Sequence, residues 1–278
     1  SVGSRYEYGK LKVADFTTLA SYNSTFVAGG EPDFTELLLN AGAVWQLHTN
    51  VRLYASYSEG FSMPDVGRVL RDINTPGLSV DSFLTIQPVI SDNLELGVEF
   101  NFDNWQLRAS AYRSDSDLGS RLEPDADGIY SVMREKTEIN GIEAEGHYYF
   151  SADSQLGFSY ARTKGRFDSN ADGRVDTDLG GVNIAPERLN LHWQQQWLPK
   201  LSSRLQANIL FSHTLNTAEQ FNGYTTLDLS SSYDTNYGRW TLGIENLTDK
   251  QYFTYYAQST PANARYFAGI GRTLNLSW

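Results

Sequence analysis

Hydrophobic and polar residues alternate one by one along most of this chain. Between residues 36 and 47, for example, Leu39, Ala41 and Trp45 occupy one parity, whereas Asn40 and Gln46 occupy the other. A β-strand points successive side chains to opposite faces, so this pattern predicts strands with one apolar and one polar face. The pattern recurs in about twelve segments, which cover residues 2–16, 36–47, 51–58, 94–101, 105–112, 142–150, 156–160, 188–197, 205–211, 227–233, 240–245 and 265–278.

Short turns and long connections alternate between these segments. Short turns are expected at 48–50, 103–104, 152–154, 199–200 and 236–238, and long connections at 59–92, 114–137, 163–186 and 252–263. This alternation is typical of the antiparallel meander of outer-membrane barrels, which have short periplasmic turns and longer outer loops. We therefore expect the first strand to run outward, the last strand to run inward, and both termini to lie at the periplasmic end.

The apolar strand faces leave two fold classes open. A soluble β-sandwich also alternates, but its strands are mostly short, about five to six residues. Strands of about ten residues suit a tilted membrane strand, and a polar face rich in Arg, Glu, Gln and Asn does not suit a sandwich core. We predict an all-β fold, an antiparallel up-and-down transmembrane β-barrel. The residues expected on its lipid-facing side include Leu53, Leu96, Leu107, Trp193, Leu229 and Leu276.

The last segment, residues 265–278, continues the alternation to a terminal aromatic residue, Trp278. An apolar strand face that ends in an aromatic residue suits a membrane strand whose last residue lies in the interfacial girdle. The same parity places Arg272 on the lipid side, where an arginine costs about 2 to 4 kcal/mol near the midplane. We expect Arg272 to turn away from lipid through a glycine bulge, or to find a hydrogen-bonding partner between Glu245 and Asp249.

Charge and composition exclude several classes of partner and structure for the chain. It has 278 residues, a formal net charge of −11 and no cysteine. The acidic balance argues against nucleic acid as a partner, because phosphate binding needs clustered Lys and Arg. The missing cysteines exclude disulfide and thiol chemistry. The chain also has no run of about 18 apolar residues, so no transmembrane helix is predicted. Aromatic residues make up 13% of the chain, which suits two interfacial girdles.

Ionisable residues recur on the polar parity of several strands. In lipid each of them would be costly, so we expect them to face a lumen, where they line water or pair with one another. Substrate binding is the less favoured interpretation. The set comprises Arg52, Glu95, Glu99, Arg108, Glu143, Glu145, His147, Arg188, His192, Arg204, Asp228 and Glu245.

One acidic loop has the spacing of a calcium site. Asp168, Asn170, Asp172 and Asp176 place oxygen atoms at mostly alternate positions around Gly173, as in the first half of an EF-hand loop. The bidentate glutamate expected at the twelfth position is replaced by leucine, so the last aspartate would have to serve instead. An acidic hydrophilic outer loop is the favoured interpretation, and calcium binding is the alternative.

The sequence contains no set of residues that supports catalysis. An outer-membrane lipase or protease would need a serine with histidine, or paired aspartates with histidine, held together near the rim. The chain has four histidines, and none accompanies a nucleophile motif such as G-x-S-x-G. We expect no enzyme activity and no required cofactor.

Four motifs spread along the chain carry a family resemblance. The ending has G-x-G-R followed by alternation to a terminal aromatic, at Gly269, Gly271, Arg272 and Trp278. The stretch IENLTDKQY at 244–252 contains the signature N-L-x-D-x-x-Y. The stretch YASYSEGFSMPD at 54–65 contains a G-F-x-x-P core, and NGIEAEG at 140–146 contains G-x-E-A. Together these motifs resemble the TonB-dependent outer-membrane receptors of the ferric-siderophore class.

This resemblance implies uptake of a ferric siderophore across a Gram-negative outer membrane, energised by the TonB complex. Family members hold a plug domain inside a barrel of about 22 strands. Residues 1–278 would therefore be the C-terminal portion of the barrel domain, without the plug, or a smaller closed barrel. The implied partners are the plug, outer-membrane lipid and lipopolysaccharide, and the barrel-assembly machinery, which would contact the C-terminal strand. The alternative is a non-specific pore or structural barrel without a dedicated ligand.

The implied ligand suggests a binding site in the outer loops. Ferric siderophores are often anionic and flat-faced, so arginine and aromatic side chains at a barrel mouth would suit them through charge and stacking. Ordinary loop surface is the alternative for each residue taken singly. The candidates are Arg68, Arg71, Arg121, Arg134, Tyr130, Tyr252, Tyr255 and Tyr256.

Overall fold

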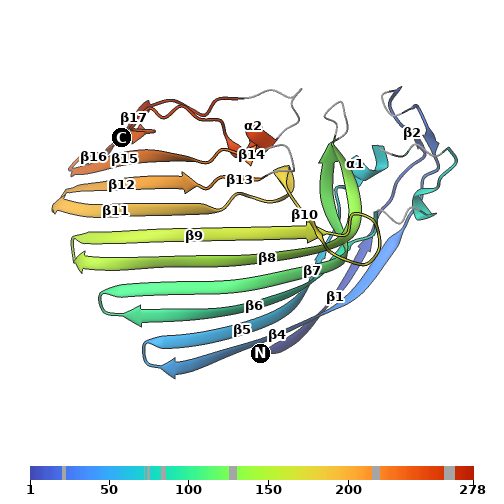
Figure 1. Ribbon diagram of the computed structural model, residues 1–278, viewed down its shortest axis with the longest axis horizontal. Helices are drawn as coiled ribbons and strands as arrows, with labels where there is room; N and C mark the ends of the chain where they lie inside the picture. The colour runs from blue at the N-terminus through green and yellow to red at the C-terminus, as the bar shows by residue number, and fades with distance from the viewer. Residues whose placement is uncertain are drawn as a thin grey trace.

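The computed structural model describes residues 1–20, 23–71, 73, 76–82, 86–124, 130–214, 220–259 and 267–278. Its main feature is one antiparallel sheet of 13 strands, in which neighbouring strands follow the order β1-β4-β5-β6-β7-β8-β9-β11-β12-β15-β16-β17. The remaining strand, β10, pairs with β9 beside this path. Figure 1 shows these strands side by side in a single curved sheet. The predicted antiparallel meander is confirmed.

The strands of the path are long, whereas the helices are short. The path consists of β1 (Val2–Lys10), β4 (Asp33–His48), β5 (Val51–Ser62), β6 (Val89–Phe102), β7 (Trp105–Pro124), β8 (Tyr130–Ser151), β9 (Ser154–Phe167), β11 (Arg188–Leu198), β12 (Leu201–Leu210), β15 (Tyr224–Thr235), β16 (Gly238–Glu245) and β17 (Thr273–Ser277). The minor strands are β2 (Phe16–Thr17), β3 (Phe26–Val27), β10 (Thr177–Asp178), β13 (His213–Thr214) and β14 (Gln220–Phe221). The helices are α1 (Val66–Arg71), α2 (Tyr255–Ser259) and the 3-10 segments η2 (Val80–Ser82) and η4 (Gly181–Asn183). Within the described ranges, no helix has the length and apolar content to cross a membrane.

Short turns join the path strands at one end of the sheet, which we call the turn end. These turns connect β4 to β5, β6 to β7, β8 to β9, β11 to β12 and β15 to β16, and all of them were predicted. The longer connections lie at the opposite end, which we call the outer end. Because neighbouring strands are antiparallel, β1 runs toward the outer end and β17 runs toward the turn end, as expected from the sequence.

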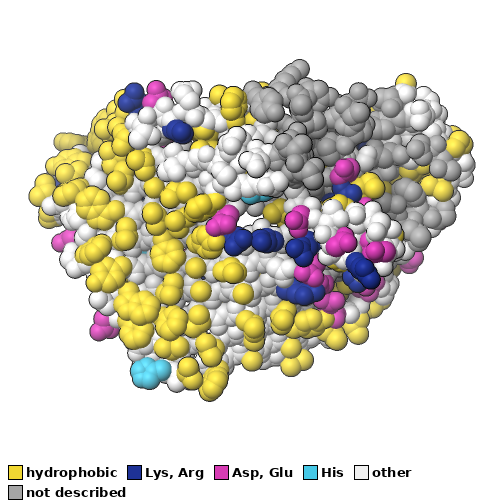
Figure 2. Space-filling view, in the orientation of Figure 1, with side chains coloured by type: hydrophobic (Ala, Val, Ile, Leu, Met, Phe, Trp, Pro, Cys, Tyr) yellow, Lys and Arg dark blue, Asp and Glu magenta, His cyan; other side chains and the backbone are white. Residues whose placement is uncertain are grey.

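The strand register gives the sheet one apolar and one polar face. One cross-strand row joins Trp45, Leu53, Val98, Ala109 and Ala144. The next row toward the turn end is polar and joins Gln46, Arg52, Glu99, Arg108 and Glu145. Figure 2 shows apolar side chains spread over the outer surface of the sheet. We call this surface the lipid face and the opposite one the lumen face. The apolar residues do not form the core of a two-sheet sandwich, so the predicted barrel architecture is confirmed.

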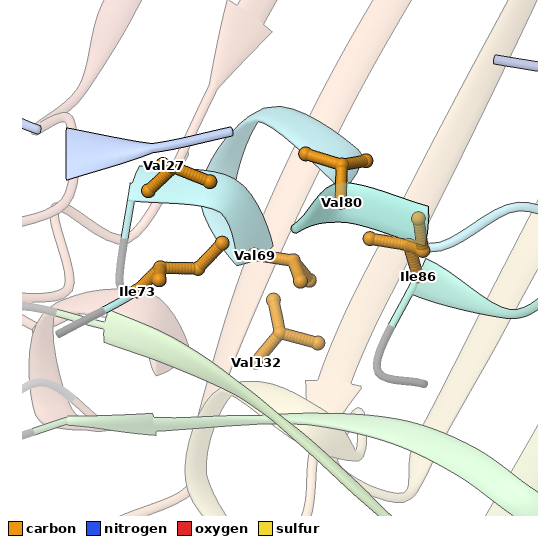
Figure 3. Close-up of a cluster of buried hydrophobic side chains, with 6 residues drawn as sticks. All are labelled: Val27, Val69, Ile73, Val80, Ile86 and Val132. Atoms are coloured by element: carbon orange, nitrogen blue, oxygen red, sulfur yellow. The ribbon is translucent and has the colours of Figure 1, made fainter. Parts of the chain in front are cut away.

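A small hydrophobic core lies at the outer end instead of inside the sheet. It gathers side chains from β3, α1, η2 and β8 and from the segments beside them, and Figure 3 shows these side chains converging. Its buried members are Val27, Val69, Ile73, Val80, Ile86 and Val132. Burial of these side chains removes apolar surface from water, which stabilises the long connections as a packed cap.

Residues 114–137 were predicted as a loop, but most of them form a paired extension of β7 and β8. The ladder between these strands continues to the pair of Pro124 and Tyr130, past a register shift between Ser116 and Gly119. Strand β9 likewise continues to Phe167, beyond the point where a loop was predicted. These extensions lie beyond the apolar rows, and their few apolar residues, such as Leu122 and Val132, pack at the core of the outer end. They are too widely spaced to form an apolar–polar alternation, so the sequence pattern could not reveal these extensions.

The last strand is shorter than predicted. The alternation predicted a strand over residues 265–278, whereas β17 covers only Thr273–Ser277, and residues 265–266 lie outside the described ranges. Side chains, and not a neighbouring strand, form hydrogen bonds with the backbone before β17. Asn246 Nδ2 donates to the Ile270 carbonyl at 3.1 Å, and the backbone amide of Arg272 donates to Asp249 Oδ1 at 3.0 Å. Arg272 stays exposed, so the expected turn away from the lipid face is not seen. The bond to the expected partner segment comes from its backbone amide, and no guanidinium contact is found among the described residues.

Candidate functional site on the lumen face and at the outer end

Four charged side chains form an alternating row across the lumen face. Arg52 on β5, Glu99 on β6, Arg108 on β7 and Glu145 on β8 are direct neighbours in the register. Glu99 accepts from Arg52 Nε at 2.7 Å and from Arg108 Nη2 at 2.7 Å, and it is only 7% exposed. The second arginine also lies 4.0 Å from Glu145. A buried charge is tolerated where opposite charges surround it, so these residues pair with one another.

Further polar groups line small spaces along the same face. The ring of Tyr54 covers Gly97, where a Cβ atom would lie 2.2 Å from the ring. The missing side chain lets the tyrosine lie along the sheet and donate its hydroxyl to Glu95 at 3.0 Å. Two cavities of about 290 and 270 Å³ open on this face, and Glu143 and Arg188 line the first of them. The lumen face is therefore hydrophilic and rich in both signs of charge.

Two further lumen candidates connect the last strands of the sheet. Asp228 on β15 accepts from Asn208 Nδ2 at 2.7 Å and from the backbone amide of Asn246 at 2.9 Å. Glu245 at the end of β16 accepts from Asn275 Nδ2 at 3.0 Å. Each carboxylate faces the lumen and accepts a hydrogen bond from a residue on a neighbouring strand. These contacts are structural, and a contact with a plug or a substrate stays a prediction.

Two of the arginines predicted for ligand binding hold the outer framework together. Arg121 pairs with Glu135 at 2.5 Å and with Glu123, and its guanidinium lies 4.1 Å from the ring centroid of Phe167. Arg134 donates to backbone carbonyl groups on both sides of it, and burial lowers its pKa. Their donors are occupied within the protein, so their first role is to fix the extended hairpin of β7 and β8.

The aromatic candidates differ in how much of each side chain is exposed to solvent. Tyr255 donates its hydroxyl to the carbonyl groups of Gly181 and Ile184, which fixes α2 to η4. Burial raises the pKa of this phenol. Tyr256 on the same helix is 62% exposed, so its ring is open to a ligand. The side chain of Tyr130 lies outside the described residues.

Asn183 is a framework residue that the sequence analysis missed. Its side chain accepts from the Leu122 amide at 2.7 Å and donates to the Leu122 carbonyl at 2.9 Å, as a paired strand would. This contact joins η4 to β7. Together with Tyr255 it links the extended hairpin, η4 and α2 into one connected unit at the outer end. No motif marks this asparagine, because its role depends on a contact between distant segments.

The other two arginine candidates lie in the last turn of α1, which contacts β8. Arg68 Nε is 3.6 Å from Asp65 Oδ2, which is too long for a strong hydrogen bond. Arg71 lies three residues further along the helix, and both side chains are partly exposed. The Arg68 side chain therefore has only this long contact with a carboxylate among the residues that the structure describes.

A cavity of about 680 Å³ at the outer end does not suit an anionic ligand. Its lining combines two cations, Arg113 and Lys136, with a larger number of carboxylates. These are Asp33, Glu36, Asp92, Asp115, Asp117 and Glu138. An anion in this cavity would meet mostly like charge, which disfavours binding.

The predicted calcium loop is organised by its own backbone. The Asp168 carboxylate accepts from the amides of Asn170 at 3.3 Å, Asp172 at 3.2 Å and Gly173 at 2.7 Å. Asp176 accepts from the hydroxyl of its neighbour Thr177. Within the part of the chain that the structure describes, no three His, Cys, Asp or Glu side chains gather as a metal site. Calcium binding by this loop stays a prediction.

We expect the loop to bind calcium only weakly, with a dissociation constant on the order of 10⁻⁴ to 10⁻³ M, because a cation must compete with the backbone amides for Asp168. Titration calorimetry should give a calcium heat that Asp172→Ala removes. The matched control is Asp153→Ala, in the exposed turn between β8 and β9. No heat in the unmodified protein, or equal heats in all three proteins, would rule the loop out as a calcium site.

Comparison with known proteins identifies the family. The family model described as "TonB dependent receptor-like, beta-barrel" matches residues 1–247. The chain belongs to this family. Members of this family are receptors and transporters, so this receptor barrel is not an enzyme.

Two relatives of the receptor barrel are named for the ligand that they receive. The ferric aerobactin receptor of Klebsiella pneumoniae is 26% identical over 99% of this chain and 41% of its own length. The rhizobactin receptor of Rhizobium meliloti (strain 1021) is 23% identical over 94% of this chain and 37% of its own length. The solved structure of the copper transporter OprC has the same fold, with a TM-score of 0.79 at 19% identity, covering 98% of this chain and 44% of that chain. The receptor barrel thus spans about two fifths of the curated relatives that it matches.

Proposed function

We propose that this receptor barrel takes part in the uptake of a ferric siderophore across the outer membrane of a Gram-negative cell, energised by TonB. The observation that carries this proposal is the similarity of nearly the whole chain to receptors named for ferric aerobactin and rhizobactin. The share of those relatives that it covers supports the interpretation of residues 1–278 as the C-terminal portion of a larger plugged barrel.

The geometry of the sheet fits this function. The lipid face carries the apolar rows that a membrane requires, and the lumen face carries charges that a water-filled or plug-filled interior requires. The cap at the outer end holds the candidate ligand residues Arg68 and Arg71 on α1. The candidate Tyr256 lies on α2, which Tyr255 fixes to η4. The remaining proposed partners are the plug at the lumen face, the barrel-assembly machinery at the C-terminal strand, and outer-membrane lipid and lipopolysaccharide at the lipid face.

Uptake of iron-labelled siderophore by cells that depend on this receptor tests the proposal. Ferric aerobactin and ferric rhizobactin are the first ligands to compare, and uptake should require both the receptor and an intact TonB complex. A non-specific pore would instead pass unrelated small solutes at the same rate with or without TonB. That outcome would replace the proposed function with the pore alternative.

Replacing Arg68 and Arg71 with alanine in the complete receptor should weaken binding of an anionic ferric siderophore about 10- to 100-fold, because each arginine offers a charge-assisted hydrogen bond. The affinity of the unmodified receptor should also fall as salt is added, since exposed charges are screened. Fluorescence quenching or calorimetry on the purified receptor measures both effects.

The matched control for this pair is Lys200→Ala with Arg239→Ala, two basic residues at the turn end. The control should leave the affinity unchanged, and both variants should keep the thermal unfolding profile of the barrel. Equal affinities for the Arg68 and Arg71 variant and the unmodified receptor would remove these arginines from the ligand site.

A further inference from the structure

Two of the four histidines of the chain meet on the lumen face. His147 on β8 and His192 on β11 both face Gly157, which lies between them on β9. Their ring centroids are 5.7 Å apart, and the ring planes are inclined by 64°. The strand register therefore brings two imidazoles from distant segments of the chain into contact.

Gly157 creates the space between the two rings. A Cβ atom at this position would lie 2.9 Å from His147 Nδ1 and 2.5 Å from His192 Nε2. Both distances are shorter than the separation of about 3.5 Å or more at which non-bonded heavy atoms attract each other best, so any larger residue would push the rings apart. The glycine lets one nitrogen atom of each ring border the same small space.

The ring nitrogens of this pair have no hydrogen bond and no ion pair within the part of the chain that the structure describes. Both side chains are partly buried, and polar groups that are removed from water are usually hydrogen-bonded. In contrast, Nδ1 of His48 accepts a hydrogen bond from the Asn50 amide. The nitrogens of His147 and His192 are therefore available to a ligand.

The charges around the pair give a cation little net attraction. His147 lines the cavity of about 270 Å³ on the lumen face, together with two glutamates and two arginines of the charged row. On the other side of the pair, Gln206 faces His192 and accepts from Arg204 Nη2 at 2.9 Å. The Arg204 side chain is exposed, so water and salt screen its charge. An ion at the pair would thus be held by coordination to nitrogen and not by charge.

This ligand set selects one class of ion. Imidazole nitrogen suits divalent transition metals such as Zn²⁺ and Cu²⁺, whereas Ca²⁺ and Mg²⁺ take oxygen ligands. A zinc ion lies about 2.0 to 2.1 Å from each coordinating nitrogen, and rotation of either ring over Gly157 can bring both nitrogens to this distance from one ion. The pair supplies two ligands, so water fills the remaining positions.

We propose that His147 and His192 form a binding site for a free divalent transition-metal ion, Zn²⁺ or Cu²⁺, on the lumen face. The ion joins β8 to β11 across β9, so its binding stabilises the folded sheet. The site is separate from the outer end, where the candidate siderophore ligands lie. The inference therefore goes beyond the proposed uptake of a ferric siderophore and does not depend on it.

Titration calorimetry with Zn²⁺ alone tests the site in the complete receptor, purified without a polyhistidine tag and stripped of metal with a chelator. The variant H147Q/H192Q should bind Zn²⁺ at least about 10-fold more weakly, because loss of even an outer-shell partner typically costs 10- to 100-fold in metal affinity. The matched control H48Q/H213Q removes the other two histidines of the chain and should keep full binding.

Electron paramagnetic resonance with Cu²⁺ alone identifies the coordinating atoms. The spectrum of the unmodified receptor should show coupling of the copper to two imidazole nitrogens, and H147Q/H192Q should lose this signal. Thermal unfolding provides an independent measurement: Zn²⁺ should raise the midpoint of the unmodified receptor and of the control, and it should raise that of H147Q/H192Q less.

The variant Gly157→Ala keeps both histidines and tests their geometry. The added methyl group meets the ends of the two rings and displaces them, so Zn²⁺ should bind about 10-fold or more weakly, while unfolding without metal confirms that the fold is kept. Each of three results would overturn the proposal: equal Zn²⁺ binding by H147Q/H192Q and the unmodified receptor, an equal loss in the control, or full binding by a folded Gly157→Ala receptor.

Discussion

Replacing Asn246 with aspartate is expected to lower the free energy of unfolding of the barrel by about 3 kcal/mol, because two buried carbonyl groups would lose their donor and face a carboxylate. Asn246 is 4% exposed. Its Nδ2 group donates to the carbonyls of Lys250 at 2.9 Å and Ile270 at 3.1 Å, and its Oδ1 accepts from the Lys250 amide at 2.8 Å. No other side chain of this size supplies both donors and the acceptor. Thermal or urea unfolding in detergent measures the change.

Two further variants separate the causes of this effect. Asn246 has a φ of 49°, in the left-handed region where asparagine and glycine are tolerated. Asn246→Gly keeps this conformation and removes only the hydrogen bonds, so it should cost less than the aspartate variant. Asn236→Asp, in the exposed turn between β15 and β16, should have almost no effect. If all three variants unfolded like the unmodified barrel, the side chain of Asn246 would not anchor the last strand.

Replacing Glu99 with glutamine is expected to lower the free energy of unfolding by about 2 to 3 kcal/mol. Breaking a buried ion pair by removing one partner costs about 3 to 5 kcal/mol, and the half-exposed arginines reduce this cost. The variant leaves Arg52 and Arg108 facing each other without the carboxylate between them. The same unfolding measurement in detergent detects the loss.

A double variant shows whether the unpaired arginines cause this loss. Adding Arg52→Gln to Glu99→Gln removes one of the two like charges, so the double variant should be more stable than the sum of its single changes predicts. Glu143→Gln on the same face is the matched control, and it should change stability by less than about 0.5 kcal/mol. Strict additivity, or a loss at Glu143 as large as that at Glu99, would contradict the role of the charged row.

The sequence predicted the path strands and their faces because both follow from local alternation. Leu53 and Leu96 lie on the lipid face, and Arg52 and Glu99 on the lumen face, as their parity requires. The extension of β7 and β8 beyond Ser114 was not predicted, because its apolar residues, such as Leu122 and Val132, are too few and too widely spaced to form an alternation. The predicted start of β17 was wrong for the opposite reason. The alternation of the sequence extends over residues whose backbone groups bond to the side chains of Asn246 and Asp249 and not to a neighbouring strand.

The candidate site was predicted as a set of residues but not as a set of contacts. Parity placed Arg108 on the lumen face, whereas its partner depends on the register between β6 and β7, which no local pattern encodes. At the outer end, Arg121 and Arg134 were grouped with the ligand residues by type alone. Their carboxylate and carbonyl partners come from neighbouring strands and distant connections, so their structural roles emerge only in three dimensions.

The alternating row of Arg52, Glu99, Arg108 and Glu145 has a consequence for anything that moves along the lumen face. Each positive site is followed within one strand spacing by a negative one, so the electric field of the row decays over a distance comparable with that spacing. Such a wall offers no deep electrostatic trap for either sign of charge. Passage requires that a solute bind weakly enough to leave. A wall of this kind therefore favours release of a charged cargo once it has left its binding site.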